Sequence, residues 1–323
     1  MSSPLLSVRE LSKRWGAAGP FDRRGGAEAL DRVSFELEAG EALAIAGESG
    51  SGKTTLGLLV ARLEESSGGE ILLEGEDWLA LSGAALRRAR RNVQMVFQDP
   101  ATSLDPRLRV GESVAEPLRA LCGLAGAPLR DRVAALFASV GLDPAAVRRY
   151  PREFSGGERQ RIAIARAIAP DPRIVVCDEP VAALDPSARA RVLNLLLDLR
   201  EKTGVAYLFI SHDMDAIRVI ADRVAVLYAG RLVEEAPAEE FFAAPRHPYS
   251  AALLDGRALP GEPPDPAAYP TGCRFHPRCP SARERCAEAP PSLDRSGGRR
   301  TACFFPAEQA EKTKLSGADR VIG

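Results

Sequence analysis

One loop of nine residues restricts the possible folds of this chain more than any other feature. The loop consists of Gly47, Glu48, Ser49, Gly50, Ser51, Gly52, Lys53, Thr54 and Thr55. It fits the pattern G-x-x-x-x-G-K-S/T, whose backbone N–H groups surround nucleotide phosphates. Glycines are required because the backbone approaches the phosphates in conformations that a Cβ would obstruct. A Gly/Ser-rich linker is the alternative, but residues 42–46 and 55–60 flank the loop with the patterns of a strand and a helix. The loop therefore predicts nucleotide binding.

Two side chains of the loop add a charge and a metal ligand. Lys53 can reach the β- and γ-phosphates as a point charge, and the Thr54 hydroxyl can hold Mg²⁺. A helix that begins near Gly52 adds the positive end of its dipole. These groups predict that the nucleotide binds together with Mg²⁺.

The composition is that of a soluble globular protein. The chain has 323 residues, of which 45% are hydrophobic and 27% are charged, and its net charge is −1. That balance gives no reason to expect nucleic acid as a partner. No apolar run approaches the roughly 18 residues that span a bilayer, and the N-terminus does not resemble a signal peptide. We expect a cytoplasmic protein whose contact with a membrane comes through a partner.

Strands and helices alternate along most of the chain, which predicts a mainly parallel sheet. Residues 99–154 differ, because their apolar side chains recur at helical spacing and indicate a small helical insert. Apolar runs predict strands at residues 5–11, 33–37, 93–97, 174–177 and 205–210, a helix at 187–202, and a hairpin formed by 224–228 and 231–234. In a sheet of this kind the ligand lies at the carboxyl ends of the strands.

Four polar side chains follow predicted strands and belong at that edge. Asp178 can bind Mg²⁺ directly or through water, and the amide oxygen of Gln98 can coordinate the same metal. Glu179 can orient or deprotonate the attacking water, with a solvated carboxylate as the alternative. His212 can contact the γ-phosphate or the water, with a structural histidine as the alternative. Together they predict hydrolysis of a nucleotide.

Several motifs occur in an order that carries a family resemblance. They are the phosphate loop, Gln98, Phe154-Ser155-Gly156-Gly157-Glu158, residues 174–179, Ala183-Leu184-Asp185 and His212. In this order they resemble ATP-binding-cassette (ABC) ATPases. The Ser-Gly-Gly element discriminates, because kinases and small GTPases have no counterpart. Its N–H groups open a helix and can bind a γ-phosphate.

The resemblance implies that the ATP site is shared between two chains. Two cassettes enclose two ATP molecules head to tail, each between the phosphate loop of one chain and the residues 155–158 of the other. It also implies that Asp185 lies at the dimer contact and that Trp15 stacks on adenine, with core packing as the alternative for Trp15. Phe154 stands where many members carry Leu, and Glu158 where many carry Gln. We expect activity to survive both departures.

Further motifs resemble the peptide/nickel branch of ABC importers, and within it the F-type member of the paired ATPases. They are residues 95–100, 103–107, 150–154, 177–181 and 247–249. The resemblance implies a second ATPase subunit, identical or different, two membrane-spanning permease subunits docked on the helical insert, and, through the complex, an extracytoplasmic solute-binding protein. It places the chain at the cytoplasmic face of the inner membrane. Peptides are the expected cargo, and nickel, glutathione or sugars are alternatives.

The resemblance also fixes the expected fold class and domains. We expect an α/β fold with a P-loop NTPase core, a mainly parallel sheet, N-terminal antiparallel strands and a helical subdomain at about residues 99–170. The ATPase domain would cover residues 1–256. Residues 257–323 would form a Pro-rich linker and a cysteine-containing extension.

Four cysteines follow the Pro-rich stretch at residues 260–270, and they are Cys273, Cys279, Cys286 and Cys303. In a reducing cytosol, clustered cysteines indicate a metal site rather than disulfides. Residues 272–280 resemble the C-terminal extension of peptide-branch ATPases, some of which are thought to hold a 4Fe–4S cluster. Four thiolates suit Fe–S or zinc. We expect a 4Fe–4S cluster, with zinc or cysteines without metal as alternatives.

Two other functions compete with import. A soluble ABC protein of DNA repair or translation usually carries two cassettes or a long coiled-coil insertion, whereas this chain shows one phosphate loop and a short insert. A regulatory module that binds ATP without turnover conflicts with the intact Glu179 and His212. The sequence therefore predicts an ATPase that powers an importer.

Overall fold

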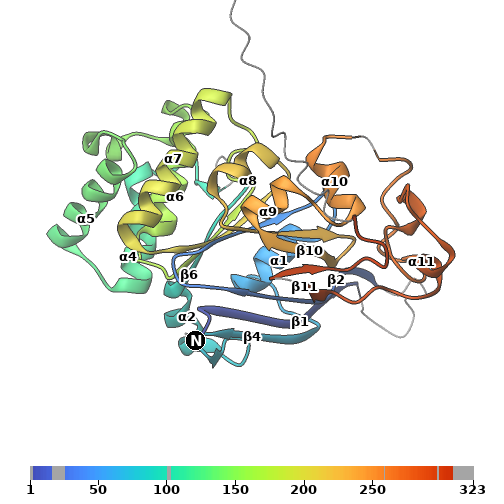
Figure 1. Cartoon of the computed structure of the whole chain (residues 1–323). Helices are drawn as coiled ribbons and strands as arrows, with labels where there is room; N and C mark the ends of the chain where they lie inside the picture. The colour runs from blue at the N-terminus through green and yellow to red at the C-terminus, as the bar shows by residue number, and fades with distance from the viewer. Residues whose placement is uncertain (1–2, 17–25, 100–102, 258, 297, 308–323) are drawn as a thin grey trace, which may run out of the picture.

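The larger of two sheets runs through the middle of the molecule and contains eight strands in the residues that the structure describes (Figure 1). The computed structural model describes residues 3–16, 26–99, 103–257, 259–296 and 298–307. The strand order is β11-β12-β10-β9-β3-β8-β7-β6, and neighbours from β9 to β6 are parallel. The strands are β3 (Ala42–Ala46), β6 (Val93–Val96), β7 (Ile174–Asp178), β8 (Ala206–Ser211), β9 (Arg223–Tyr228), β10 (Arg231–Pro237), β11 (Asp294–Ser296) and β12 (Arg299–Thr301).

A smaller antiparallel sheet with the order β2-β1-β4-β5 packs beside it. Its strands are β1 (Leu6–Trp15), β2 (Ala27–Leu37), β4 (Gly68–Leu73) and β5 (Glu76–Asp77). The expected first strand at residues 5–11 was too short, because β2 pairs along β1 as far as Trp15 opposite Ala27. The antiparallel N-terminal strands and the mainly parallel central sheet confirm the expected fold class.

The helices cover both faces of the larger sheet. They are α1 (Lys53–Val60), α2 (Gly83–Ala89), α4 (Val110–Cys122), α5 (Gly126–Ser139), α6 (Gly156–Ile168), α7 (Pro186–Thr203), α8 (Met214–Ile220), α9 (Ala238–Ala243), α10 (Pro248–Leu254) and α11 (Glu284–Glu288). Short 3₁₀ turns lie at Arg90–Asn92, Pro144–Arg148, Pro151–Glu153 and His276–Arg278. Local sequence signals set both ends of helix α7. The Asp185 side chain accepts from the N–H of Ala188, Pro186 is the first helical residue, and Gly204 ends the helix at a φ of 69°.

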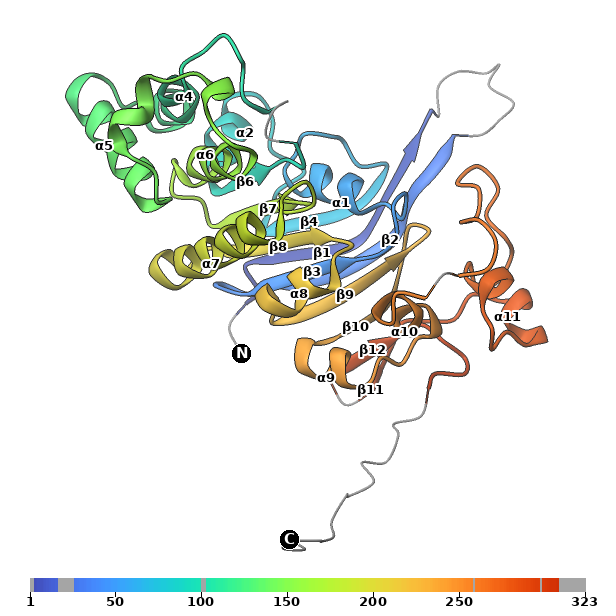
Figure 2. The ribbon, with the colours of Figure 1, turned by 90° about the horizontal axis from the view of Figure 1, so that it is seen from above.

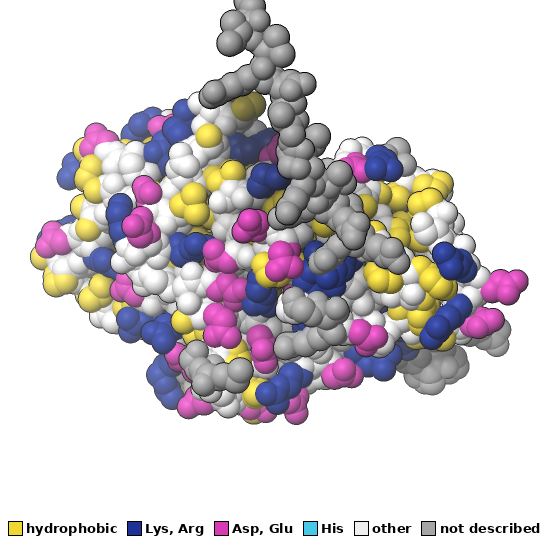
Figure 3. All heavy atoms as spheres, in the orientation of Figure 1, with side chains coloured by type: hydrophobic (Ala, Val, Ile, Leu, Met, Phe, Trp, Pro, Cys, Tyr) yellow, Lys and Arg dark blue, Asp and Glu magenta, His cyan; other side chains and the backbone are white. Residues whose placement is uncertain are grey.

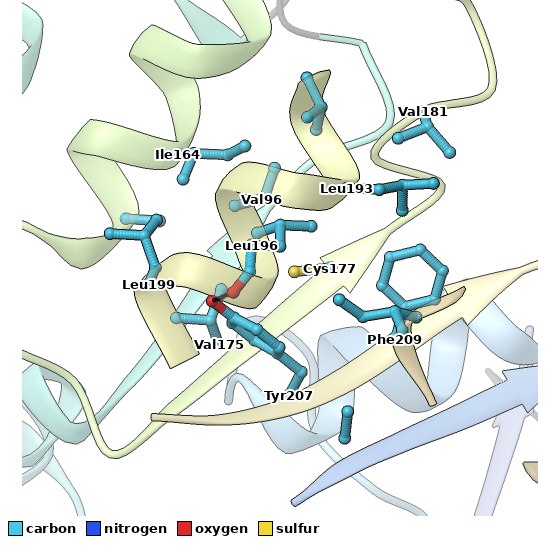
Figure 4. Close-up of a cluster of buried hydrophobic side chains, with 14 of the residues drawn as sticks. Val96, Ile164, Val175, Cys177, Val181, Leu193, Leu196, Leu199, Tyr207 and Phe209 are labelled. Carbon is cyan, nitrogen blue, oxygen red and sulfur yellow. Dashed lines mark hydrogen bonds between the residues drawn. The ribbon is translucent and has the colours of Figure 1, made fainter. Parts of the chain in front are cut away.

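Successive side chains of the central strands point to opposite faces of the sheet, so the hydrophobic core has two parts. Leu43 and Ile45 of β3 join a cluster with α1 and the small sheet, whereas Ala42, Ala44 and Ala46 face α6, α7 and α8. Every residue of β3, β7 and β8 is buried, as parallel strands covered on both faces require. Figure 4 shows Cys177 of β7 among Leu193, Leu196 and Phe209, where burial raises the pKa of its thiol. Cys177 is therefore a core side chain.

The helical insert and the C-terminal extension lie at opposite ends of the molecule (Figure 2). Helices α4 and α5 stand at one end, and α11 stands at the other. The extension adds two strands to the central sheet: β12 pairs with β10 at Glu234 opposite Thr301 and Glu235 opposite Arg300, and β11 pairs with β12. It therefore lengthens the central sheet beyond β10, at the side opposite β6.

The surface carries both signs of charge. Lys and Arg side chains alternate with Asp and Glu side chains over the face in Figure 3. Among the helices of the described residues, none has the length and apolar character needed to cross a bilayer.

Candidate active site

The phosphate loop follows β3, and three of its glycines have backbone angles that other residues rarely adopt. Their φ values are 154° at Gly47, 79° at Gly50 and 105° at Gly52. A Cβ on Gly47 would lie 2.3 Å from the carbonyl oxygen of Leu227, and one on Gly52 would lie 2.4 Å from that of Ala29. Glycine is required here by conformation and by the neighbouring strands.

Lys53 begins α1 and points back into the loop. Its ammonium donates to the carbonyl oxygens of Gly47 and Glu48, both at 2.8 Å. Burial lowers the pKa of Lys53, and the nearby carboxylates of Glu179 and Asp178 oppose that effect. The ammonium and the helix N-terminus therefore present positive charge at one place, where an anion is stabilised.

Asp178 ends β7 beside the first turn of α1. The Thr54 hydroxyl donates to Asp178 Oδ1 at 3.2 Å, so two oxygen ligands from distant parts of the chain meet. Burial raises the pKa of Asp178, whereas the Thr54 hydroxyl and Lys53 lower it. A hydroxyl and a carboxylate are the hard oxygen donors that Mg²⁺ prefers, so the residues present fit this metal.

Glu179 has a strained backbone and a fixed side chain. Its φ is 48°, a value that is uncommon for a residue with a Cβ. Oε1 lies 2.7 Å from His212 Nδ1, and Oε2 accepts from the Ser211 hydroxyl at 3.2 Å. The carboxylate is buried while the His212 ring is largely exposed. Two strand ends therefore hold a carboxylate–imidazole pair at the sheet edge.

Most of the predicted residues line one cavity of about 680 Å³. The predicted residues in its wall are Trp15, Glu48, Ser49, Gly50, Gly52, Lys53, Thr54, Thr55, Gln98, Glu179 and His212. Asp178 reaches it through Thr54, while Gly47 and Ser51 lie in the loop behind the wall. A nucleotide-sized cavity with a phosphate loop at one end fits the predicted chemistry.

The far end of the cavity is apolar and includes residues that the sequence did not indicate. Trp15 is 38% exposed there, with the Lys13 ammonium 4.3 Å from its ring centroid. The opposite residues come from α10 and the extension, and among them are Leu253 and Tyr269. The Tyr269 hydroxyl donates to the carbonyl oxygen of Glu28, in β2. Nothing in the Pro-rich stretch around Tyr269 signals this contact.

The residues of the Ser-Gly-Gly element lie outside the cavity. Ser155 caps α6: its Oγ accepts from the Glu158 N–H at 3.3 Å, and Glu158 Oε2 accepts from the Ser155 N–H at 2.8 Å. Ser155 is exposed, and a Cβ on Gly157 would lie 2.9 Å from that of Ala188. Asp185 is exposed as well, at the start of α7. Within one chain, the structure does not bring residues 155–158 and Asp185 to the phosphate loop's cavity.

The four extension cysteines face one small space. Cys273, Cys279, Cys286 and Cys303 are free thiols that line a cavity of about 10 Å³. Burial raises the pKa of Cys303 to about 11 and raises those of Cys273 and Cys279 as well. As arranged, no group of three or more Cys, His, Asp or Glu side chains among the described residues could hold a metal ion. The thiols converge without forming a metal site.

The fold and the site define an ATP-binding cassette. Residues 30–182 match the family model for ABC transporters, and residues 233–286 match that for the C-terminal region of oligopeptide/dipeptide transporters. The chain belongs to the ABC transporter family of ATPases. It is 44% identical to the dipeptide transport ATP-binding protein DppF of Escherichia coli, over 94% of this chain and 95% of the relative. It is also 44% identical to the probable peptide ABC transporter ATP-binding protein y4tS of Sinorhizobium fredii, over 96% and 92%.

Solved structures share the fold. The dimeric cassette MJ0796 in a post-hydrolysis state with ADP and Pi aligns with a TM-score of 0.64 and 29% identity, over 72% of this chain and 98% of that one. CbiO1 of Clostridium perfringens, part of the transporter complex CbiONQ, aligns with a TM-score of 0.65 and 27% identity, over 74% and 91%. These likenesses confirm the cassette fold.

Proposed function

We propose that this chain is the ATP-hydrolysing subunit of an importer that powers peptide uptake through partner permeases. The main observation in support is that the phosphate loop, Gln98, Glu179 and His212 line one cavity. The relatives named for dipeptide and peptide transport supply the cargo class, and the match to the oligopeptide/dipeptide C-terminal region supports it. Nickel, glutathione or a sugar is the second cargo class, and a soluble non-transport ABC ATPase is the remaining alternative.

Each side chain at the edge has one proposed task. Lys53 and the loop N–H groups bind the phosphates. Thr54, Gln98 and Asp178 would hold Mg²⁺, which neutralises charge on the transferred phosphate when bound. Glu179 orients or deprotonates the attacking water, and His212, 2.7 Å from Glu179, contacts the γ-phosphate or that water.

The site needs a second cassette, identical or different. Residues 155–158 form a helix N-terminus outside the cavity of their own chain, where the N–H groups of Gly156 and Gly157 could meet a phosphate bound by another chain. Asp185 would lie at the same contact. The similarity to a dimeric cassette bound to ADP and Pi supports this arrangement.

A second surface suits the permeases. A groove of about 220 Å³ lies between α4 and the end of β6, and its wall includes Leu63, Phe97, Leu121 and Arg166. Leu63 is 46% exposed and Phe97 is 37% exposed, and both large apolar side chains line this one groove. Phe97 precedes Gln98, so a permease helix in this groove would lie next to a proposed Mg²⁺ ligand. The solute-binding protein would join through the permeases, and the chain would lie at the cytoplasmic face of the membrane.

The four extension cysteines form the last part of the proposal. Cys273, Cys279, Cys286 and Cys303 would hold a 4Fe–4S cluster, with zinc or no metal as alternatives. Their support is that all four line one cavity. The metal would require the thiols to move together and to lose their protons, which burial opposes.

Uptake in cells that lack the gene tests the proposed function. We expect loss of radiolabelled dipeptide uptake, recovery with the wild-type chain, and no recovery with Glu179→Gln. Glu239→Gln, an exposed carboxylate in α9, serves as the matched control and should restore uptake. Unchanged dipeptide uptake in the deletion strain, with loss of nickel uptake instead, would transfer the proposal to the second cargo class.

A further inference from the structure

The extension holds the phosphate loop directly through Arg278. The guanidinium donates from Nη1 to Glu48 Oε2 at 2.8 Å and from Nη2 to Glu48 Oε1 at 3.2 Å. Arg278 is only 6% exposed and the Glu48 side chain is 30% exposed, so this two-point pair is shielded from solvent on the arginine side. Charge-assisted pairs with this geometry are among the strongest hydrogen bonds in proteins.

Other contacts fix Arg278 before it meets the loop. Its Nε donates to the carbonyl oxygen of Pro260 at 3.0 Å, and Nη1 lies 3.3 Å from the Tyr228 hydroxyl. Arg278 ends a 3₁₀ turn and precedes Cys279, one of the four clustered cysteines. Its position therefore depends on the folded extension.

A second group, from α10 of the cassette, holds the backbone of Glu48. The Glu48 N–H donates to the Tyr249 hydroxyl at 2.7 Å. Tyr249 is fully buried, with ring centroids 4.6 Å from Tyr228 and 5.4 Å from Phe275 of the extension. Both the side chain and the N–H of Glu48 are thus held from outside the cassette's loop.

Glu48 also contacts the lysine of the phosphate loop. Its carbonyl oxygen, together with that of Gly47, accepts from the Lys53 ammonium. Fixing a residue's backbone costs conformational entropy. When Arg278 and Tyr249 fix Glu48 in advance, that cost is met before the nucleotide arrives.

We propose that Arg278 is a positioning residue for the phosphate loop, so that the docked extension prepares the loop to bind ATP. This inference rests on the proposed ATP site. Because coupling is reciprocal, ATP binding should also stabilise the docked extension. A purely structural ion pair would instead tie the extension to the cassette and leave the affinity for ATP unchanged.

Kinetics of the full-length chain with Mg²⁺-ATP separate the two roles. We expect Arg278→Ala to raise KM about tenfold, as loss of a charge-assisted pair does, with kcat at saturating ATP within threefold of wild type. Arg278→Lys keeps the charge but loses the two-point hydrogen bonding of the guanidinium, so its KM should lie between those of the wild type and Arg278→Ala. Arg285→Ala, an exposed arginine of the same extension, is the control and should leave KM unchanged.

A double-mutant cycle supplies the second readout. Because Arg278 acts through Glu48, Arg278→Ala with Glu48→Gln should raise KM no further than either single change. A wild-type KM in folded Arg278→Ala, or effects that add in the double variant, would overturn the inference. If Arg278→Ala fails to fold, KM is measured in Arg278→Lys and in Tyr249→Phe instead. A wild-type KM in both variants would overturn the inference. Failure of the wild-type chain to bind ATP would instead reject the proposed function.

Discussion

The catalytic edge and the C-terminal extension lie against each other, but different forces place their residues. At the edge, parallel pairing sets positions: Ala46 lies opposite Ser211, and Asp178 lies opposite Ile210. The extension is held by a short strand and by arginines paired with cassette carboxylates. These pairs are Arg274 with Glu28 and Asp31, Arg278 with Glu48, Arg299 with Glu234, and Arg300 with Glu235.

This difference predicts which property a substitution in each region will change. Strand-end residues keep their places as long as the sheet does, so changes there should alter chemistry without unfolding. A buried arginine such as Arg299 leaves an unpaired buried charge when its partner is lost, which typically costs about 3–5 kcal/mol. Changes in the extension should therefore appear first in stability and in ATP affinity.

Glu179→Gln gives the largest expected effect, confined to the edge. We expect hydrolysis to fall by about a hundred- to a thousandfold, because the amide cannot take a proton from water. ATP binding should persist, and an ATP-bound dimer should accumulate in light scattering. Unchanged turnover would remove Glu179 from its role, and equal loss in Glu239→Gln would show a nonspecific effect.

His247 gives the next effect, in stability rather than in chemistry. His247, whose ring centroid lies 5.7 Å from that of Phe275, is 1% exposed, and burial lowers its pKa to about 3. The unfolded chain takes up a proton below about pH 6.5 whereas the folded chain does not, so stability falls as the pH drops from 6.5 towards 3. At about 1.4 kcal/mol per pH unit, the loss by pH 5 is about 2 kcal/mol.

Urea unfolding at pH 7 and pH 5 measures this loss. In His247→Asn the amide oxygen can replace Nδ1 as acceptor for the Tyr249 N–H, so the helix cap is kept. We expect the wild type to lose about 2 kcal/mol more than the variant between the two pH values. Equal losses would place the titration elsewhere.

Trp15→Ala should have a smaller effect, at the apolar end of the cavity. Stacking of a base on an aromatic ring contributes about 1–3 kcal/mol, so we expect KM for ATP to rise about tenfold with little change in kcat. Trp15→Phe retains a ring and should stay near wild type. If both variants match the wild type, Trp15 packs against protein and does not stack on adenine.

Cys279→Ser should change hydrolysis least, because no cysteine lines the ATP cavity. We expect protein purified without oxygen to contain iron, the variant to lose it, and kcat to stay within twofold. Cys122→Ser, in α4, is the matched control. Absence of iron, zinc and visible absorbance in the wild type would remove the metal from the account.

The sequence predicted the edge well because strand ends are local features. Asp178, Glu179 and His212 lie at the ends of apolar runs, Lys53 follows the loop that leaves another such run, and a parallel sheet brings such ends together. The hydroxyl of Ser211 on Glu179 was missed, although its place directly before His212 could have suggested it.

The sequence did not predict the contacts of the extension with the cassette, because these contacts join residues far apart. Arg278 and Glu48 are separated by 230 positions, and the Tyr269 hydroxyl and Glu28 by 241. No periodicity encodes such pairs, since they depend on the path of irregular chain. The grouping of four cysteines predicted a metal site, and the structure brings the thiols to one cavity without making a metal site among the described residues.

The central claim is that the phosphate loop is half of a site completed by residues 155–158 of another cassette. Two copies of the chain joined by a flexible linker test it directly, with Lys53→Ala and Ser155→Arg as the changes. When the two changes lie in different copies, one composite site keeps an intact loop and an intact Ser155. When they lie in the same copy, both composite sites are broken.

The measurement is the ATPase rate of the two linked proteins. The account predicts about half of the wild-type rate with the changes in different copies and almost none with both in one copy. The reverse pattern, activity only when one copy is left unchanged, would show that each chain hydrolyses ATP alone and would contradict the account.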